Sequence, residues 1–280
     1  MGTLYVVGTP IGNLNDITYR AASTLKSVDF ICAEDTRVTA QLLNFLDTKK
    51  PLVSYHEHNA KAVGGSICDR IAAGENAAVV TDAGMPCISD PGELLVKLCA
   101  ERGIPVTVVP GPAACISALA VSGLDTARFV FEGFLPVEKK PRAARLAAAA
   151  RKEETLIFYE APHKLIKTLE DMLSYLGDRK ISLCRELTKL HEEIIRTTIS
   201  AAIERFSQDG NRPRGEFVLV VEGCAGQPQE EETTIEAALE QVRSLAENGM
   251  RPADACREIA KVTPFSKGEL YSAYLEGKEQ

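Results

Sequence analysis

Five short apolar runs in the first 110 residues alternate with segments of helical length, and this alternation constrains the fold most strongly. The runs cover residues 4–8, 29–34, 51–55, 76–82 and 105–110. Amphipathic segments lie between them, at 16–27, 36–46, 60–73 and 91–102. Continuous apolar runs of this length are typical of strands buried on both faces of a parallel sheet. The alternation therefore predicts α/β units with right-handed crossovers.

A second series of apolar runs follows, at 128–136, 155–162, 180–187 and 215–223. Its expected helices are 138–151, 163–176 and 192–206, the last of which includes the strand-like sequence RTTIS. The sequence PGPAAC lies between the two series, so we expect one α/β domain over 1–112 and a second over 113–225. The polar and acidic residues 226–234 are typical of a linker. Short helical periodicities at 235–248, 252–262 and 266–276 predict a small C-terminal helical unit over 235–280.

The composition is typical of a soluble globular protein, with 45% hydrophobic and 25% charged residues. A formal net charge of −7 argues against general adhesion to nucleic acid or to an anionic membrane. The eight cysteines form no CxxC pair and no metal-like spacing with the histidines, so we expect buried thiols in a reducing cytoplasm and no metal site. No secretory signal is expected at the N-terminus. The uncharged stretch between Arg102 and Asp125 is divided by prolines, so we expect no membrane span.

Each of the first five runs ends in a loop that is polar or rich in glycine and proline. The loops are GTPIGN (8–13), AEDTR (33–37), SYHEHN (54–59), TDAGMPCISDPG (81–92) and PGPAA (110–114). The carboxyl ends of parallel strands share one edge of a sheet, and open α/β sheets bind ligands at that edge. An ordinary turn is the simpler interpretation of any one loop. No GxGxxG or GxxxxGK[ST] motif is present, so the site must be built from these main-chain loops.

The loops and several later motifs, in unbroken order, are similar to the ribosomal RNA small subunit methyltransferase I family of the tetrapyrrole methylase superfamily. The motifs run from Leu4 to about Gly223 and read LYVVGTPIGNLNDIT, AEDTR, SYHEHN, VVTDAGMPCISDPG, VPGPAA, FEGFLP, FYEAPHKL, CRELTKLHEE and GEFVLVVEG. The resemblance implies two α/β domains with S-adenosylmethionine in the cleft between them. It also implies a cytoplasmic homodimer that methylates the ribose 2′-oxygen of a cytidine in 16S ribosomal RNA of the small subunit.

The same resemblance implies a set of cofactor contacts. In the first domain these are Pro10, Asp82, Ala83, Gly84, Met85 and Ile88, with Ser117 and Ala118 at a helix start. Segments that hold Leu135, Tyr159, Pro162 and Glu186 would close over the cofactor from the second domain. Main-chain groups in tight loops can hold such a ligand without burying an unpaired charge. Met85 also fits a simpler role as a gap-filling core residue.

Methyl transfer requires alignment of the acceptor oxygen with the sulfonium, and a base that removes its proton would help. The candidates are side chains at strand ends or in the following loops, namely Asp35, His56, Glu57, Asp90 and Glu160. Several have simpler roles. Asp35 can cap the helix at 36–46 or pair with Arg37, which can also hold a phosphate. Asp90 precedes Pro91 and can cap the helix at 91–102.

An acidic chain that binds RNA needs local basic surface. Residues 139–152 contain no acidic residue and six basic ones, Lys139, Lys140, Arg142, Arg145, Arg151 and Lys152. This pattern predicts a helix whose cations contact phosphate, and a solvated helix face is the alternative. Further candidates are Arg37 and Lys164, the pair Arg212 and Arg214, and in the C-terminal unit Arg251, Arg257, Lys261 and Lys267.

Two other functions fit the same residues. A tetrapyrrole C-methyltransferase would use the same cofactor, but its basic helix would have no phosphate to contact. A non-catalytic ribosome-binding factor would keep the fold without binding S-adenosylmethionine.

Overall fold

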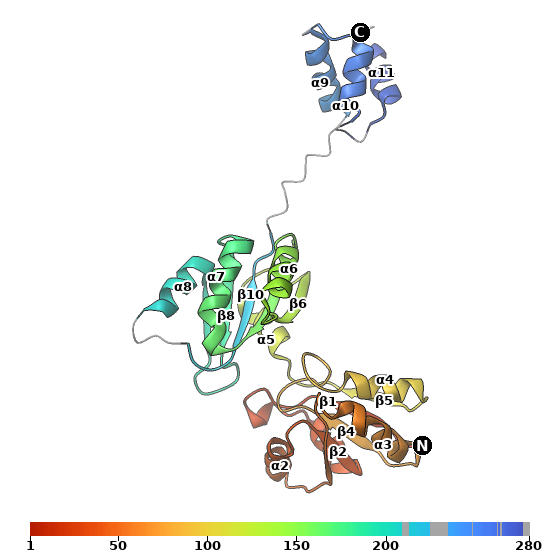
Figure 1. The fold of residues 1–280 in the computed structure, drawn as a ribbon, viewed down its shortest axis with the longest axis vertical. Coiled ribbons are helices and arrows are strands. Elements are labelled where there is room, and N and C mark those ends of the chain that lie inside the picture. Colours follow the sequence, from red (N-terminus) through yellow and green to blue (C-terminus); the bar gives the residue numbers. More distant parts are fainter. Residues whose placement is uncertain (209–212, 225–234, 248, 262, 264, 277–280) are drawn as a thin grey trace. The chain divides into compact units, whose positions relative to one another are not determined.

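The computed structural model describes residues 1–208, 213–224, 235–247, 249–261, 263 and 265–276. Its contacts divide the chain into two compact units, Met1–Cys224 and Ala225–Gln280 (Figure 1). The expected linker at 226–234 and the RNA candidate Arg212 lie outside the described residues. Among the helices that the structure describes, none is both long and apolar enough to span a bilayer.

The first sheet is parallel, as the alternating pattern predicts. Its strands are β1 (Leu4–Val7), β2 (Phe30–Ala33), β3 (Leu52–Ser54), β4 (Ala77–Val80) and β5 (Val106–Val109), in the order β3-β2-β4-β1-β5. The helical segments between them are η1 (Leu14–Asp16), α1 (Tyr19–Ser27), α2 (Thr36–Phe45), α3 (Ala60–Ala72) and α4 (Glu93–Glu101). Alternate residues of one strand enter different cores, since Val79 packs with α3 and α4 while Val80 packs with α1 and α2. Helices on both faces explain why these strands are continuously apolar.

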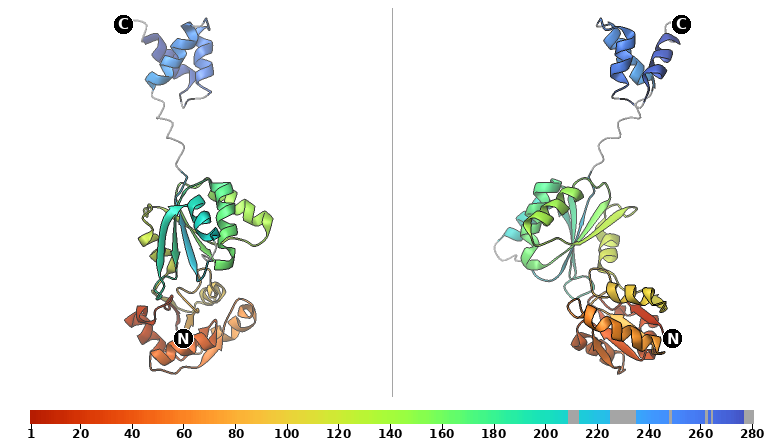
Figure 2. Two further views of the ribbon diagram at one scale, coloured as in Figure 1. Left: turned by 90° about the vertical axis from the view of Figure 1, so that its left-hand side faces the viewer. Right: turned by 45° about the vertical axis from the view of Figure 1, so that its right-hand side comes forward.

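The second sheet is mixed, and helices cover both of its faces. It contains β6 (Phe129–Phe134), β7 (Thr155–Glu160), β8 (Lys180–Arg185), β9 (Glu193–Thr198) and β10 (Phe217–Val221), in the order β6-β7-β10-β8-β9. One face packs against α6 (Lys139–Ala149), α7 (Leu165–Leu176) and α8 (Ile199–Ser207). The other packs against α5 (Ala114–Ser122), as Figure 2 shows. The short helix η2 (Pro162–Lys164) connects β7 to α7.

Two expectations for this second part are wrong. The predicted helix at 192–206 is a strand over its first half, because β9 pairs along its whole length with β8 and Thr198 then caps α8. The second series also does not form repeated parallel units. Of its described strand pairs, β6–β7 is parallel, and β10–β7, β10–β8 and β8–β9 are antiparallel. The strand β10 is buried on both faces despite its antiparallel neighbours, so its apolar run did not reveal its direction.

The unit Ala225–Gln280 contains α9 (Ile235–Glu247), α10 (Pro252–Ile259) and α11 (Lys267–Glu276), close to the expected ranges. Its core includes Val242, Cys256 and Leu270. The boundary that the sequence predicts at 112 falls between β5 and α5, inside the unit Met1–Cys224. The helix α5 packs on the second sheet. The division into domains at 1–112 and 113–225 stays a prediction.

Candidate functional site

The loops after β1 and β4 are joined through their backbones at the carboxyl edge of the first sheet. Thr9 N donates to Gly84 O over 2.9 Å, and Gly84 N donates to Thr9 O over 3.2 Å. The Thr9 hydroxyl donates to Thr81 O over 3.1 Å. Gly84 has a φ of +85°, a conformation that glycine adopts without steric cost. The predicted loop is therefore an ordered part of this edge.

The loop after β5 reaches the same place, beside the side chain of Met85. Gly8 N donates to Val109 O over 3.0 Å. A methyl group built on Gly8 would lie only 2.6 Å from Met85 Sδ, so the loops after β1, β4 and β5 approach without space for a side chain. Met85 is half-buried and also packs against the core between the first sheet and the helices α3 and α4, in agreement with its simpler role.

Carboxyl groups gather along this edge, where the loops after β2 and β4 meet. Asp35 N donates to Asp82 Oδ1 over 3.0 Å, and Asp82 N donates to Glu34 Oε2 over 3.4 Å. Burial raises the pKa of Glu34, against the lowering effect of the Asp82 N–H. Burial, followed by the charges of Glu34 and Asp82, raises the pKa of Asp90 to about 6. The edge is therefore suited to a ligand that carries positive charge.

Of the five candidate bases, Asp35 has the simplest role. It is the N-cap of α2, accepting from Arg37 N over 2.8 Å, and its carboxylate pairs with the Arg37 guanidinium. The hydrogen bonds from Arg37 lower the pKa of Asp35 to about 2. Asp35 therefore has both of its simpler roles in the structure: it caps α2 and it pairs with Arg37.

Asp90 does not cap α4, so that expectation is wrong. The N-cap is Gly92, with a φ of +135°, and a Cβ there would lie 2.7 Å from Cys87 Sγ. The chain needs glycine at this position because Cys87 N bonds to Pro91 O and folds the loop back on itself. Asp90 is left half-buried in the loop, near the other carboxyl groups.

The remaining base candidates differ in their surroundings. His56 is half-buried, and its Nδ1 has no hydrogen-bond partner among the described residues. Glu57 is exposed, and its Oε1 lies 3.4 Å from Nε2 of His58. Glu160 is buried at the end of β7, where its oxygens accept from Ala161 N and from the Thr168 hydroxyl. Glu160 is thus bound to α7.

Segments of the second sheet contact the loops of the first at several points. A Cβ on Gly12 would meet Lys189 Cγ at 2.6 Å, so the loop after β8 lies against the loop after β1. A Cβ on Gly133, in the bulge of β6, would meet Ser89 Oγ at 3.1 Å. The Tyr159 hydroxyl accepts from Cys115 N over 3.2 Å, which places β7 beside the start of α5.

These contacts place most predicted cofactor residues around one edge. The Tyr159 hydroxyl accepts from Cys115 N in the first turn of α5, the helix that also contains Ser117 and Ala118. Glu186 binds the Lys189 that lies against Gly12. Pro10 is buried next to the Thr9 bridge, while Asp82, Ala83 and Ile88 are exposed. Leu135 and Pro162 follow β6 and β7, and Leu135 lines a pocket between α6 and α7 instead. Their roles in binding a cofactor stay predictions.

The basic side chains of 139–152 divide into two groups. The guanidinium of Arg142 binds Asp171, while Arg145 and Lys152 both pair with the buried Glu132. The other group is exposed, and the described residues offer it no ion pair; it contains Lys139, Lys140 and Arg151, and Lys164 and Arg214 elsewhere in the chain share this property. In the C-terminal unit Arg251 and Arg257 pair with Asp254, Lys261 pairs with Glu258, and Lys267 is exposed.

Sequence reasoning missed Glu34, Glu132 and Lys189. Glu132 is a charged residue inside the apolar strand FVFEGF, and this was a usable signal, since a buried carboxylate needs cationic partners. Glu34 was visible within AEDTR, but its closeness to Asp82 and Asp90 depends on the order of the strands.

Comparison with known proteins identifies this fold, a parallel sheet with its loops gathered at one edge followed by a mixed second sheet, as that of a methylase. Residues 3–203 match the family described as Tetrapyrrole (Corrin/Porphyrin) Methylases. The structure resembles the cobalamin biosynthetic enzyme cobalt precorrin-4 methyltransferase with a TM-score of 0.58 and 19% identity, over 78% of this chain and 94% of that chain.

Relatives with higher identity share one name, Ribosomal RNA small subunit methyltransferase I. The protein of Synechocystis sp. is 45% identical over 99% of this chain and 98% of its own length. That of Thermotoga maritima is 49% identical over 224 residues, which are 80% of this chain and 99% of the relative. The chain belongs to the tetrapyrrole methylase family of S-adenosylmethionine-dependent methyltransferases and, within it, to the ribosomal RNA small subunit methyltransferase I family.

Proposed function

We propose that this protein transfers a methyl group from S-adenosylmethionine to the ribose 2′-oxygen of a cytidine in 16S ribosomal RNA. The family membership supports methylation of small-subunit ribosomal RNA. The observation that carries the proposal is the meeting of the loops after β1, β4 and β5 beside a row of carboxyl groups.

The residues at this edge fit the cofactor by charge and by shape. S-adenosylmethionine supplies a methyl group on a positively charged sulfur. Glu34, Asp82 and Asp90 provide negative charge that stabilises such a group. Because Gly8 and Gly84 carry no side chains, the loops after β1, β4 and β5 pack closely, and their backbone atoms form the wall of the proposed site. The contacts expected from Pro10, Asp82, Ala83, Gly84, Met85 and Ile88 belong to this proposal, as do those from Ser117, Ala118, Leu135, Tyr159, Pro162 and Glu186.

Asp90 is the side chain best suited to take the proton of the 2′-hydroxyl. Asp35 is held by Arg37, and Glu160 by Thr168 and Ala161. Asp90 is half-buried in the loop that holds Gly84. Its pKa is raised to about 6, which is closer to pH 7 than the pKa of an ordinary aspartate. A base works best when its pKa lies near the working pH. His56, whose Nδ1 has no hydrogen-bond partner in the described part of the chain, is the second candidate at the same edge.

The same acidic edge repels RNA phosphates, so the RNA has to be held elsewhere. The exposed Lys139 and Lys164 in the second part of the unit are suited to this task. We further propose that the enzyme acts in the cytoplasm as a homodimer on the small ribosomal subunit. In support, β5 is an edge strand that exposes Val106 and Val108, and unpaired edges of this kind favour pairing between chains.

The test is methyl transfer from labelled S-adenosylmethionine to small subunits that lack the modification. We expect label in the 16S RNA and one phosphodiester that resists alkaline hydrolysis, because a methylated 2′-oxygen cannot attack the neighbouring phosphate. Asp90→Asn serves as the low-activity control on the same subunits. Label in a base, or transfer to a macrocycle and not to RNA, would overturn the proposal.

A further inference from the structure

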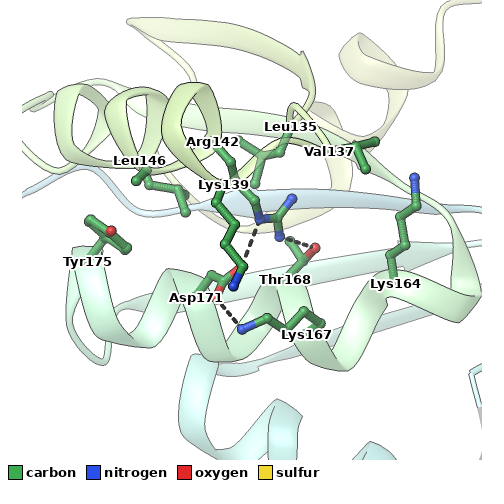
Figure 3. A pocket seen from close by; sticks show the side chains of 11 residues that line it. Leu135, Val137, Lys139, Arg142, Leu146, Lys164, Lys167, Thr168, Asp171 and Tyr175 are labelled. Atoms are coloured by element: carbon green, nitrogen blue, oxygen red, sulfur yellow. Dashed lines mark hydrogen bonds and ion pairs between the residues drawn. The ribbon is translucent and has the colours of Figure 1, made fainter.

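A pocket of about 480 Å³ lies between α6 and α7, on the face of the second sheet that these helices cover (Figure 3). Its lining residues repeat at helical spacing on the two facing sides: Lys139, Arg142, Ala143 and Leu146 on α6, and Lys164, Lys167, Thr168, Asp171 and Tyr175 at the start of α7 and along it. Leu135 and Val137 complete the wall. A volume of this size is in the range of small-ligand sites, which is about 300–1,000 Å³.

The floor of the pocket is held by a network of charges. Arg142 Nε donates to Asp171 Oδ2 over 2.7 Å, and its Nη2 donates to the Thr168 hydroxyl over 2.8 Å. Lys167 donates to the other oxygen of Asp171 over 2.7 Å. The Thr168 hydroxyl in turn donates to the buried Glu160. Two cations therefore already share the single carboxylate that lines the pocket.

Lys139 and Lys164 are left with uncompensated charge. Both are exposed, and within the described ranges neither has an ion pair. Lys139 is the first residue of α6. The N-cap of this helix is Glu138, whose side chain makes no capping hydrogen bond to the described residues. The free amides of that helix end add positive potential beside Lys139. With four cations and one carboxylate, the lining attracts an anion although the whole chain is acidic.

The remaining lining is apolar and partly open to solvent. Tyr175 is 41% exposed and Val137 is 74% exposed, so neither is used as a core residue. In Figure 3 Tyr175 and Leu146 lie at one end of the pocket and Lys164 and Val137 at the other. An inorganic anion would make no favourable contact with the apolar end of the pocket. A nucleotide has both a phosphate for the lysines and a flat base that stacks on an aromatic ring.

We infer that this pocket holds one nucleotide of the substrate RNA, with its phosphate at Lys139 and Lys164 and its base against Tyr175. The inference rests on the proposed function and names a contact through which that function selects RNA. It separates the tasks within the unit, since the acidic edge of the first sheet holds the methyl donor and this basic pocket holds the acceptor strand.

The test measures binding of a fluorescent single-stranded 16S fragment to the full-length protein across a range of salt concentrations. For Lys139→Gln with Lys164→Gln we expect weaker binding and a shallower slope of log affinity against log salt, by about 0.7 for each phosphate that is no longer neutralised. For Tyr175→Leu we expect affinity to fall about tenfold at every salt concentration with an unchanged slope, because the variant removes stacking and leaves every charge in place.

Lys140→Gln is the matched control. Lys140 is exposed on the same helix and, among the described residues, does not line the pocket. We expect it to leave Tyr175-dependent binding intact and to change the salt slope less than the pocket lysines do. Equal effects of Lys140→Gln and Lys139→Gln would show a general basic surface and overturn the inference, as would normal RNA binding by Tyr175→Leu.

Calorimetric titration with S-adenosylmethionine separates this inference from the proposed function. The pocket variants should bind the cofactor as the unaltered protein does and show the same thermal unfolding. A parallel loss of cofactor and RNA affinity would assign the pocket to the cofactor and overturn the inference. If the unaltered protein transfers no methyl group to the small subunit, the proposed function is wrong, whatever the pocket variants do.

Discussion

Gly8 and Gly111 are in backbone contact: a methyl group on Gly8 would lie 2.7 Å from Gly111 Cα, and one on Gly111 would lie 2.8 Å from the carbonyl carbon of Gly8. The contact joins the loops after β1 and β5 next to the bridge between Thr9 and Gly84. Three loops are thereby held in one arrangement by main-chain atoms. The candidate cofactor site depends on this arrangement.

Substitution Gly8→Ala should therefore force the loops apart. We expect a loss of unfolding free energy of about 1–3 kcal/mol from overpacking, and a larger loss of S-adenosylmethionine affinity than the stability change alone would cause. Urea denaturation and calorimetric titration measure the two effects. Gly65→Ala is the control, because its Cβ would meet nothing closer than Arg102 at 3.6 Å and a helical Ala is favoured over Gly by about 1 kcal/mol. Unchanged cofactor binding in Gly8→Ala would contradict the site.

The rate of methyl transfer should depend on the ionisation of Asp90. Its pKa is raised to about 6, mainly by burial and then by Glu34 and Asp82. If the carboxylate takes the proton of the 2′-hydroxyl, kcat/KM for the RNA should rise tenfold per pH unit below about pH 6 and level off above it. Asp90→Asn should lower the rate by about 10²–10⁴-fold and remove the inflection. An inflection that persists in Asp90→Asn would assign the titration to another group, with His56 the first to examine.

Folding stability should respond to Asp90 and Asp35 with opposite signs. The pKa of Asp90 is raised in the folded protein, so its contribution falls as pH rises from about 4 to about 6. Asp90→Asn should then be more stable than the unaltered protein at pH 7 by about 1–2 kcal/mol, less than the full linkage value because the group is partly solvated. The pKa of Asp35 is lowered to about 2, so its contribution is present above about pH 4 and is lost as pH falls. Asp35→Asn should be destabilising at pH 7, and urea denaturation at pH 4 and pH 7 compares the two variants.

Glu132 should be important for stability although it is not among the candidate site residues. It is 8% exposed and pairs with both Arg145 and Lys152. Glu132→Gln should cost about 2–3 kcal/mol, since both cations lose their partner but can still reach water. Glu222→Gln is the matched control, because its pair with Lys180 is exposed and is worth less than about 1 kcal/mol. Equal effects in thermal unfolding would show that burial of Glu132 adds nothing.

The unit Met1–Cys224 should fold and bind S-adenosylmethionine without the C-terminal helices. It has its own cores, and the Thermotoga maritima relative is matched over 99% of its length by an alignment of 224 residues. A chain that ends at Cys224 should show cooperative thermal unfolding and the same cofactor affinity as the full chain, compared by calorimetry. A molten or aggregated product would show that the helices α9, α10 and α11 are required for folding.

The loops of the first sheet were predictable because the relevant information is local. An apolar run followed by glycine, proline and polar residues marks the end of a buried strand, and parallel strands bring such ends to one edge. The helical cap at Asp35 was also visible, since capping depends on residues one or two positions apart. The C-terminal helices followed from their periodicity in the same way.

The environment of each side chain depended on contacts between distant residues. The pKa of Asp90 is raised first by burial in the folded loop and then by the charges of Glu34 and Asp82. Arg145 pairs with Glu132, thirteen residues away on another element. The first half of the predicted helix at 192–206 is the strand β9, because it pairs with β8, and the local sequence does not specify that pairing. Local patterns therefore identified strands, turns and caps in this chain, whereas charge partners and strand directions arose only when folding brought separate segments together, because those energies belong to pairs of residues and not to single positions.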